Sequence, residues 1–204
     1  MMQKHTLLLA LGAVALLAIP AQAGYRLMPA GTAALVGKST LQVTPSQPWN
    51  RLGGRVGRNA ESWTLDGLTL NDMTFYGGIA DNTTLFREVN KRDTPLPHFS
   101  STMLVPDVAQ LFEASYRVAN STSLMAIDSV EPAPFAGNPG FRFTYNFTVQ
   151  NEEVKRFGEA RGAIVGGKLY MITFEAPVIY YFKHDLDAFR KLSDSAVIGS
   201  TGKK

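Results

Sequence analysis

Alternating apolar and polar residues make positions 140–176 the most regular part of the chain. Every second residue from 141 to 149 is large and apolar: Phe141, Phe143, Tyr145, Phe147 and Val149. Side chains alternate across a β-strand, so this spacing predicts a strand with one aromatic and one polar face. A second run at 157–165 and a third at 169–174, joined by Gly166-Gly167, predict a three-stranded antiparallel meander. The third run is apolar on both faces, which is typical of a strand covered on each side.

After Pro177 the apolar period changes from two to about 3.6, which predicts a helix. One face of this helix is apolar and the other largely charged; the apolar residues are Val178, Phe182, Leu186, Phe189, Leu192 and Ala196. In the preceding strand, Gly158, Ala160 and Gly162 share one face that carries almost no side-chain bulk. We therefore expect the helix to approach the sheet closely at these residues.

The region before position 140 is less regular but contains the same kinds of element. Strands are expected at 39–43 and 61–65, and Asp66-Gly67 predicts a hairpin. Its return strand, which runs to Ile79, slips by one position at Asn71-Asp72, as expected for a bulge.

Between this hairpin and the meander the sequence predicts a loop, a helix and a strand. No period is visible from Asp81 to Ser101, so we expect a long surface loop. Pro106-Asp107 is a typical helix start, and apolar spacing continues to about Ala119. The run at 124–135 predicts a strand whose two prolines place it at an edge or a strand end.

The N-terminal residues predict an export signal over residues 1–23. Lys4 precedes an apolar run from Thr6 to Ile19, and Ala21-Gln22-Ala23 matches the small residues required by signal peptidase. The run is shorter than the roughly 20 residues of a spanning helix, so we expect cleavage before Gly24 and no integral membrane segment afterwards. The alternative is an uncleaved anchor. The chain has no Cys, and hence no lipoprotein anchor. The expected location is the periplasm of a Gram-negative bacterium, or outside the cell.

Charge and composition indicate one domain without a nucleic-acid partner. The formal net charge is +3, too small to indicate binding to nucleic acid or to a membrane surface. No repeat or low-complexity linker divides the chain, so we expect one domain at 36–198, a flexible lead at 24–35 and a disordered tail at 199–204. The order β-ββ-α-ββββ-α separates helices from runs of strands, which predicts the α+β class.

This element order resembles the PsbP-like superfamily, which includes a photosystem II accessory protein and a Ran-binding nuclear import factor. The likeness rests on the Gly-x-Pro-Gly turn at 137–140, the hairpin at 166–170 and the final helix ending in Asp194-Ser195-Ala196. The chain also looks like exported proteins of Gram-negative bacteria with this pattern. The resemblance implies a single-domain α/β/α sandwich with an antiparallel central sheet, and accessory or binding roles rather than catalysis. It assigns no functional residue to this sequence.

The reactive residues predict neither a metal site nor a catalytic site. Only His98 and His184 follow the signal, and two histidines without Cys do not make a zinc site. No Gly-x-Ser-x-Gly elbow is present. Glu159 and Arg161 are expected to form an exposed charged pair rather than an acid–base pair. We therefore predict no enzyme, no catalytic residue, no metal and no cofactor.

Two groups of residues remain as candidates for binding. In the Gly-rich loop at 51–58, backbone N–H groups and the guanidinium groups of Arg51, Arg55 and Arg58 suit an anion; the alternative is a solvated loop. The second group is aromatic and is expected where the meander meets the last helix, either as core or as the lining of an apolar cleft. It comprises Tyr145, Tyr170, Phe174, Tyr180, Tyr181 and Phe182.

Two functions are therefore considered. The first is an exported, non-enzymatic accessory or binding module that contacts a protein or cell-envelope partner through the loops at 51–58 and 81–101. The alternative is a small-ligand carrier or cleft enzyme with an aromatic pocket between the meander and the last helix. A closed core without a pocket above about 300 Å³ would favour the first, and a deep cavity with convergent polar groups the second.

Overall fold

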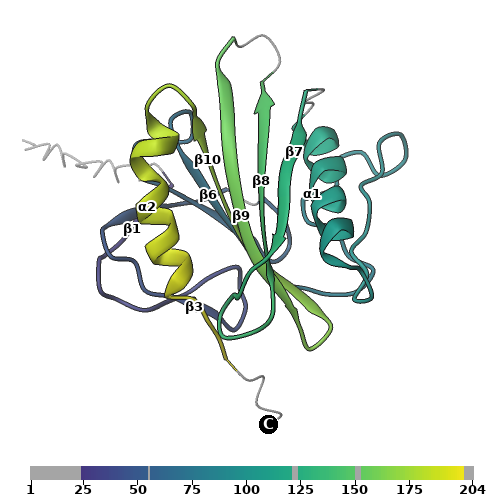
Figure 1. Ribbon diagram of the computed structural model, residues 1–204, viewed down its shortest axis with the longest axis horizontal. Helices are drawn as coiled ribbons and strands as arrows, with labels where there is room; N and C mark the ends of the chain where they lie inside the picture. The colour runs from purple at the N-terminus through teal and green to yellow at the C-terminus, as the bar shows by residue number, and fades with distance from the viewer. Residues whose placement is uncertain (1–23, 55, 121–123, 150–152, 200–204) are drawn as a thin grey trace, which may run out of the picture.

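An eight-stranded antiparallel sheet forms the centre of the molecule, and one helix lies on each of its faces (Figure 1). The computed structural model describes residues 24–54, 56–120, 124–149 and 153–199. The strand order is β1-β4-β5-β6-β10-β9-β8-β7. The strands are β1 (Tyr25–Met28), β4 (Trp49–Leu52), β5 (Ala60–Thr64), β6 (Asp72–Ile79), β7 (Ala126–Pro132), β8 (Phe141–Thr148), β9 (Lys155–Val165) and β10 (Lys168–Pro177).

The remaining elements are two helices and a small second sheet. Helix α1 spans Val105–Ala119 and helix α2 spans Tyr181–Asp194. The small sheet has the order β11-β3-β2 and contains β2 (Ala34–Leu35), β3 (Leu41–Val43) and β11 (Val197–Ile198). No helix among the described residues combines the length and the apolar character needed to cross a bilayer.

The predicted meander is confirmed as β8, β9 and β10. Along β8, buried residues alternate with partly exposed ones, as the spacing predicts. Gly166 and Gly167 have φ of 57° and 71°, the left-handed geometry of a tight hairpin. Strand β10 pairs with β6 on one side and β9 on the other and is buried on both faces.

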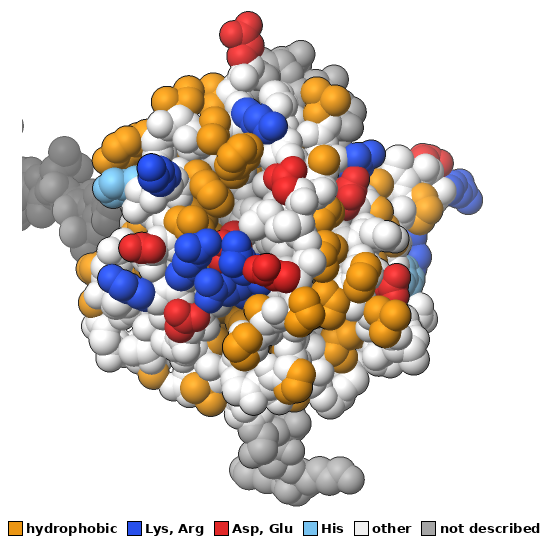
Figure 2. All heavy atoms as spheres, viewed as in Figure 1, with side chains coloured by type: hydrophobic (Ala, Val, Ile, Leu, Met, Phe, Trp, Pro, Cys, Tyr) orange, Lys and Arg blue, Asp and Glu red, His pale blue; other side chains and the backbone are white. Residues whose placement is uncertain are grey.

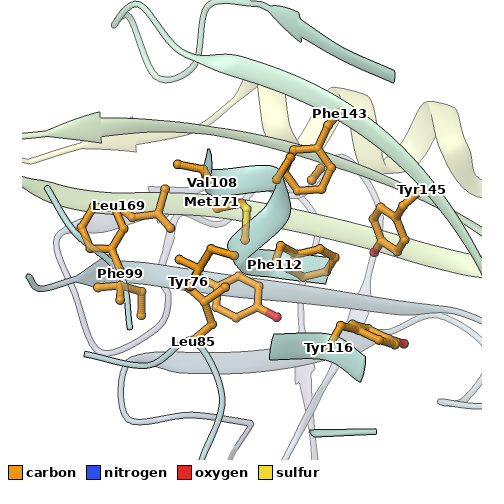
Figure 3. Close-up of a cluster of buried hydrophobic side chains, with 14 of the residues drawn as sticks. Tyr76, Leu85, Phe99, Val108, Phe112, Tyr116, Phe143, Tyr145, Leu169 and Met171 are labelled. Atoms are coloured by element: carbon orange, nitrogen blue, oxygen red, sulfur yellow. The ribbon is translucent and has the colours of Figure 1, made fainter. Parts of the chain in front are cut away.

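Neighbouring residues on one strand belong to different cores, which shows that the sheet is the middle layer. Tyr76 belongs to the core under α1, whereas Phe75 belongs to the core under α2. In the first core the ring of Phe112 of α1 lies 5.5 Å from that of Phe143 (Figure 3). In the second, Phe189 of α2 stacks on Phe174 at 5.5 Å. The α+β class and the α/β/α sandwich are thus confirmed.

The expectation that the last helix approaches the sheet at the glycines of β9 is wrong. A Cβ on Gly158 would lie 2.0 Å from the ring of Tyr145, and one on Gly162 would lie 2.7 Å from the ring of Phe141. Ala160, on the same face, lies in the core under α1 and not under α2. The space is filled by aromatic rings of β8 that lean over the next strand.

The predicted return strand after Asp66-Gly67 begins later than expected, and its bulge lies elsewhere. Asn71 is fully buried, and its Oδ1 accepts hydrogen bonds from the backbone N–H groups of Leu65 and Asp66 at 2.8 and 3.2 Å. This closes a turn, so the strand starts at Asp72. The register shift falls near Gly78, opposite Leu169 and Tyr170.

Three further expectations concern irregular segments. The segment 81–101 contains no helix or strand, as predicted, but it is not purely a surface loop, because Leu85 and Phe99 are fully buried. Residues 24–35, expected as a flexible lead, contribute β1 to the large sheet and β2 to the small one. The predicted signal at 1–23 lies outside the described residues, as does the predicted tail beyond Gly199.

Candidate functional site

Two carboxyl groups face each other from neighbouring strands. The register of β6 against β10 places Glu175 directly opposite Asp72, and Thr173 opposite Thr74. Side chains alternate along a strand, so Asp72 and Thr74 share the face of Tyr76, which belongs to the core under α1. Both acids therefore lie between the sheet and α1. Directly opposed residues in an antiparallel pair have Cβ atoms about 5 Å apart.

Hydroxyl groups fix the orientation of Glu175. The hydroxyl of Tyr116 on α1 donates to Oε1 at 2.7 Å, and that of Tyr145 on β8 donates to Oε2 at 3.1 Å. Figure 3 shows both rings beside Phe112. On the other side, Thr74 donates to Asp72 at 3.5 Å and pairs with Ser62 at 2.6 Å. The floor beneath α1 thus contains two neighbouring hydrogen-bonded polar groups inside an otherwise aromatic core.

This polar floor opens into a cavity of about 380 Å³. The floor is formed by Asp72, Thr74, Thr173 and Glu175, and the walls by α1 with Asn120, the segment 81–101, Val56 and Tyr76 of β6. The wall residues are Val56, Tyr76, Phe86, Arg87, Val89, Tyr116, Ala119 and Asn120. Both acids are partly exposed, so their carboxylates border the cavity.

The environment of this site shifts proton affinities. Burial raises the pKa of Asp72 to about 6, against hydrogen bonds from Ser62 and Thr74 and the attraction of Arg156. Burial, followed by repulsion from Asp72, raises the pKa of Glu175 to about 8. Near neutral pH the pair therefore holds about one proton, with one group neutral and the other charged.

The neighbouring phenols keep their protons. Burial and the charge of Glu175 raise the pKa of Tyr76, Tyr116 and Tyr145, so these phenols stay neutral hydrogen-bond donors. Arg156 is buried, and its guanidinium donates to the carbonyl of Thr69. Among the residues with assigned positions, Arg156 has no carboxylate within ion-pair distance.

The structure divides the predicted aromatic group between the two faces of the sheet. Phe174 and Phe182 stack at 6.0 Å in the core under α2, as expected for core packing. Tyr145 lies in the core under α1, whereas Tyr170 lies in the core under α2, on the opposite face of the sheet. Tyr180, directly before α2, is 56% exposed and stacks on His184. Tyr181, the first residue of α2, is partly exposed. Of these four tyrosines, only Tyr145 touches the acid pair.

The predicted arginine loop is also divided. Arg51 lies in β4 rather than in a loop, and its Nη2 pairs with Oε2 of Glu61 at 2.8 Å. Arg55 lies outside the described residues. Arg58 is exposed and borders a different cavity, of about 610 Å³, together with His98. Arg51 instead borders a cavity of about 480 Å³ with two other cations.

The expectation of an exposed pair at Glu159 and Arg161 is wrong. Glu159 is 1% exposed and binds Arg161 at 2.9 Å and Arg190 of α2 at 2.6 Å. Arg142 lies 3.4 Å from the same carboxylate. Burial alone would raise the pKa of Glu159, but the hydrogen bonds from Arg190 and Arg161 outweigh it and lower the pKa. Figure 2 shows basic side chains clustered on this face, with acidic ones at the border. This cluster fastens α2 to the sheet.

The two histidines also have local partners. Nδ1 of His184 lies 2.6 Å from Oδ1 of Asp185, whose other oxygen accepts from Asn71 at 3.0 Å. This chain of contacts ties α2 to the turn before β6. Nδ1 of His98 lies 2.8 Å from Oδ1 of Asn82 within the segment 81–101.

Sequence reasoning did not find Asp72 and Glu175. One signal was available, because Glu175 directly follows the run at 169–174 that is apolar on both faces. A charged residue at the end of such a buried strand is expected to have a partner or a task. The cross-strand register that brings Asp72 opposite it cannot be obtained from one sequence without knowing which strands pair.

Comparison with known proteins identifies the fold. No family model and no curated protein matches the sequence. Cyanobacterial PsbP from Synechocystis is similar in structure, with a TM-score of 0.53, 14% identity, and coverage of 93% of this chain and 99% of that protein. The likeness shows that this chain has a PsbP-like fold, as its sequence resemblance implied.

Two other solved structures are more distant. The immunity protein TplEi of the type VI secretion system of Pseudomonas aeruginosa has a TM-score of 0.36 and 10% identity, covering 74% of this chain and 45% of that one. LpqN, involved in cell envelope biogenesis of Mycobacterium tuberculosis, has a TM-score of 0.36 and 8% identity, covering 86% and 92%. Neither likeness adds to the assignment of the fold.

Proposed function

We propose that this protein is a non-enzymatic binding module of the bacterial cell envelope that holds a cationic group in the cavity beneath α1. The observation that carries the proposal is the opposed pair Asp72 and Glu175 on the floor of an open cavity. At about 380 Å³ the cavity exceeds the roughly 300 Å³ above which a small-ligand role is favoured, and its convergent polar groups with shifted pKa values are typical of a ligand site. It lies beneath α1 and not between the meander and the last helix. The cationic group belongs to a small ligand or to a side chain of an envelope partner.

The chemistry of the cavity suits an ammonium or guanidinium group on an apolar body. Tyr116 and Tyr145 hold Glu175 in place, so its carboxylate is oriented before a ligand arrives. A cation between the two carboxyls would replace the proton that they hold, and it would relieve their mutual repulsion. The rings of Phe86 and Tyr116, 6.0 Å apart and nearly perpendicular, line the same cavity and offer apolar and cation–π contact.

The position of the cavity supports a binding role for the segment 81–101. Phe86 anchors this segment in the core, while Val89, three residues later, is 92% exposed at the cavity mouth. A long loop that is anchored by buried side chains and also exposed at a cavity is more typical of a binding element than of a simple connection.

Export is the second part of the proposal. The predicted signal at 1–23 supports an extracytoplasmic location, and the PsbP-like fold is compatible with an accessory role outside the cytoplasm. Cell fractionation with N-terminal sequencing tests it: we expect the protein in the periplasm or medium, beginning at Gly24. A cytoplasmic protein that retains Met1 would contradict this part.

Calorimetric titration with putrescine and agmatine at pH 7 tests the binding site. We expect binding coupled to proton release, measured from the dependence of the heat on the buffer's ionisation enthalpy. Glu175→Gln should weaken binding by at least about tenfold, because a charge-assisted hydrogen bond contributes about 1.5–3 kcal/mol. The control Glu153→Gln removes the same charge from an exposed position outside the cavity and should leave binding unchanged. Absence of binding for both amines, or equal loss in both variants, would reject the site.

Acid–base catalysis is the second candidate, because one neutral and one charged carboxyl group is the arrangement that such enzymes use. The opposed pair Asp72 and Glu175 is the specific observation that favours it. A screen with chromogenic glycosides and esters distinguishes the two functions. Turnover that is abolished in Asp72→Asn would replace the binding proposal with an enzymatic one.

A further inference from the structure

A second cavity, at the edge of the large sheet, is lined by positive charge. It measures about 480 Å³ and lies where β1 pairs with β4. Arg26 of β1, Lys38 from the turn before β3 and Arg51 of β4 all border it. Three separate segments thus bring one cation each to the same cavity.

Only one of these cations is neutralised. Both carboxylate oxygens of Glu61 are occupied: Oε2 accepts from the N–H of Gly37 at 3.0 Å and pairs with Arg51, and Oε1 accepts from Trp63 at 2.9 Å. Within the described part of the chain, no acid other than Glu61 lines the cavity, and neither the guanidinium of Arg26 nor the ammonium of Lys38 has a hydrogen-bond or ion-pair partner. Among the described lining residues, three positive charges and one negative charge sum to a formal charge of +2.

The backbone around these cations keeps the cavity open. Gly53 packs directly against Gly24, and a Cβ on Gly53 would lie only 2.8 Å from the carbonyl oxygen of Gly24. Gly54 beside it has no atom within 4 Å of the position that its Cβ would take. A side chain at position 53 would therefore clash with the backbone of Gly24, whereas the space beside Gly54 is open.

We propose that this cavity binds a phosphate-type oxyanion. Guanidinium and ammonium groups donate charge-assisted hydrogen bonds to such groups, and Arg offers a planar fork that matches two oxygens. Arg26 and Lys38 supply the free donors, and Arg51, held by Glu61, supplies a fixed one. The site uses no residue of the cavity beneath α1, so its test is independent of the test of the proposed function.

The oxyanion has two possible sources, a free phosphate and a phospholipid headgroup. Tyr25, which also lines the cavity, is 54% exposed. An exposed aromatic side chain beside a basic cavity suits a headgroup at a lipid surface. A free ion would use the cations alone.

Two binding measurements distinguish these sources. Calorimetry with inorganic phosphate tests the free ion, and co-sedimentation with phosphatidylglycerol vesicles against phosphatidylcholine vesicles tests the headgroup. Phosphate binding with no vesicle binding supports the proposal with a free ion as source, and binding to phosphatidylglycerol vesicles supports it with a lipid source. If neither probe binds, the proposal is wrong.

The variant Arg26→Gln/Lys38→Gln tests the residues. Both side chains are exposed, so the fold should be retained, which far-UV circular dichroism checks. Arg51 is left in place because its loss would strand Glu61 as an unpaired buried acid. We expect at least about tenfold weaker binding, from the loss of two charge-assisted hydrogen bonds.

The matched control is Lys168→Gln/Lys191→Gln, which removes the same charge from exposed positions outside the cavity. Binding should then change by no more than about twofold. Equal weakening in the two double variants would show a general charge effect and would overturn the assignment, as would unchanged binding in Arg26→Gln/Lys38→Gln.

Discussion

Opposed acids in the middle of a sheet are the least expected feature at the scale of single residues. Asp72 and Glu175 are held opposite each other by the β6–β10 register, so they cannot move apart without breaking strand pairing. The nearby polar groups are Arg156 of β9 and the phenols of Tyr116 and Tyr145. The only full positive charge among these groups has no ion pair with either acid. At high pH, where both acids are charged, this pair therefore destabilises the folded state.

The first prediction concerns this pH dependence. Both acids have pKa values raised above those of the unfolded chain, so the folded state binds more protons. Their contribution to stability is fully present below about pH 4, the ordinary range of these groups, and is lost as pH rises through about 6 for Asp72 and about 8 for Glu175. Melting temperatures measured from pH 5 to pH 9 should therefore fall.

The control is Asp72→Asn, which removes one of the two charges. Its melting temperature should change less over the same range and exceed that of the wild type at pH 9. Glu159 has a lowered pKa, so its contribution is lost only as pH falls below its ordinary value of 4.5, outside this window. A melting temperature that rises between pH 5 and pH 9 in the wild type would contradict the prediction.

The second prediction concerns Gly158, where a missing side chain is a packing requirement. A Cβ there would lie 2.0 Å from the ring of Tyr145, whose hydroxyl holds Glu175. Gly158→Ala should therefore lower the free energy of unfolding by about 1–3 kcal/mol, as in an overpacked core, measured by urea denaturation. Gly54→Ala, with open space around the new Cβ, should change it by less than about 0.5 kcal/mol. Similar values for the two variants would refute the packing argument.

At the scale of elements, α2 is fastened to the sheet by one buried carboxylate. Glu159 of β9 binds Arg161 of the same strand and Arg190 of α2, and the second of these pairs crosses between the layers. Arg161 also reaches Asp194, the last residue of α2, at 2.7 Å. Glu159, which is buried, and Asp194, which is exposed, thus both connect α2 to β9. Their surroundings differ greatly in polarity.

The third prediction compares these two acids. Glu159→Gln leaves guanidinium groups without their buried counter-charge and should lower the free energy of unfolding by about 2–3 kcal/mol, less than for a fully buried pair because the arginines are partly exposed. Asp194→Asn removes a 70% exposed carboxylate and should cost below about 1 kcal/mol. If both substitutions cost the same in urea denaturation, the buried carboxylate has no special role.

How far the elements could be predicted depends on whether a pattern is local. The alternation in β8, the glycine turn before β10 and the period of α2 are set by neighbours in sequence, and all were predicted. Other features depend on which strands pair and in what register. They are the side of the sheet to which the glycines of β9 face, the burial of Glu159 and the partner of Glu175. A single sequence contains little information about such long-range pairing. For this reason the strands and helices around the cavity beneath α1 were predicted, but the cavity and its two acids were not.

At the scale of the whole molecule, the sheet separates two hydrophobic cores and forms a wall of each. Tyr76, Phe112 and Tyr145 belong to one core, and Phe75 and Phe189 to the other. Each core needs the sheet as one of its walls. The binding cavity lies on the α1 side, whereas the arginine cluster that fastens α2 lies on the opposite side, so ligand binding and helix attachment use different faces.

The fourth prediction uses the position of the two tryptophans. Trp49 and Trp63 both lie in the core under α2, so their fluorescence reports only that side. Phe112→Ala empties space under α1 and should cost about 3–5 kcal/mol. Because the sheet is common to both cores, we expect the tryptophan transition to shift as far as the far-UV circular dichroism transition, as in cooperative unfolding. Phe189→Ala, on the tryptophan side, is the matched control and should also shift both signals together. If Phe112→Ala moved the dichroism signal and left the tryptophan transition in place, the two cores would unfold separately, and the sheet would not couple them.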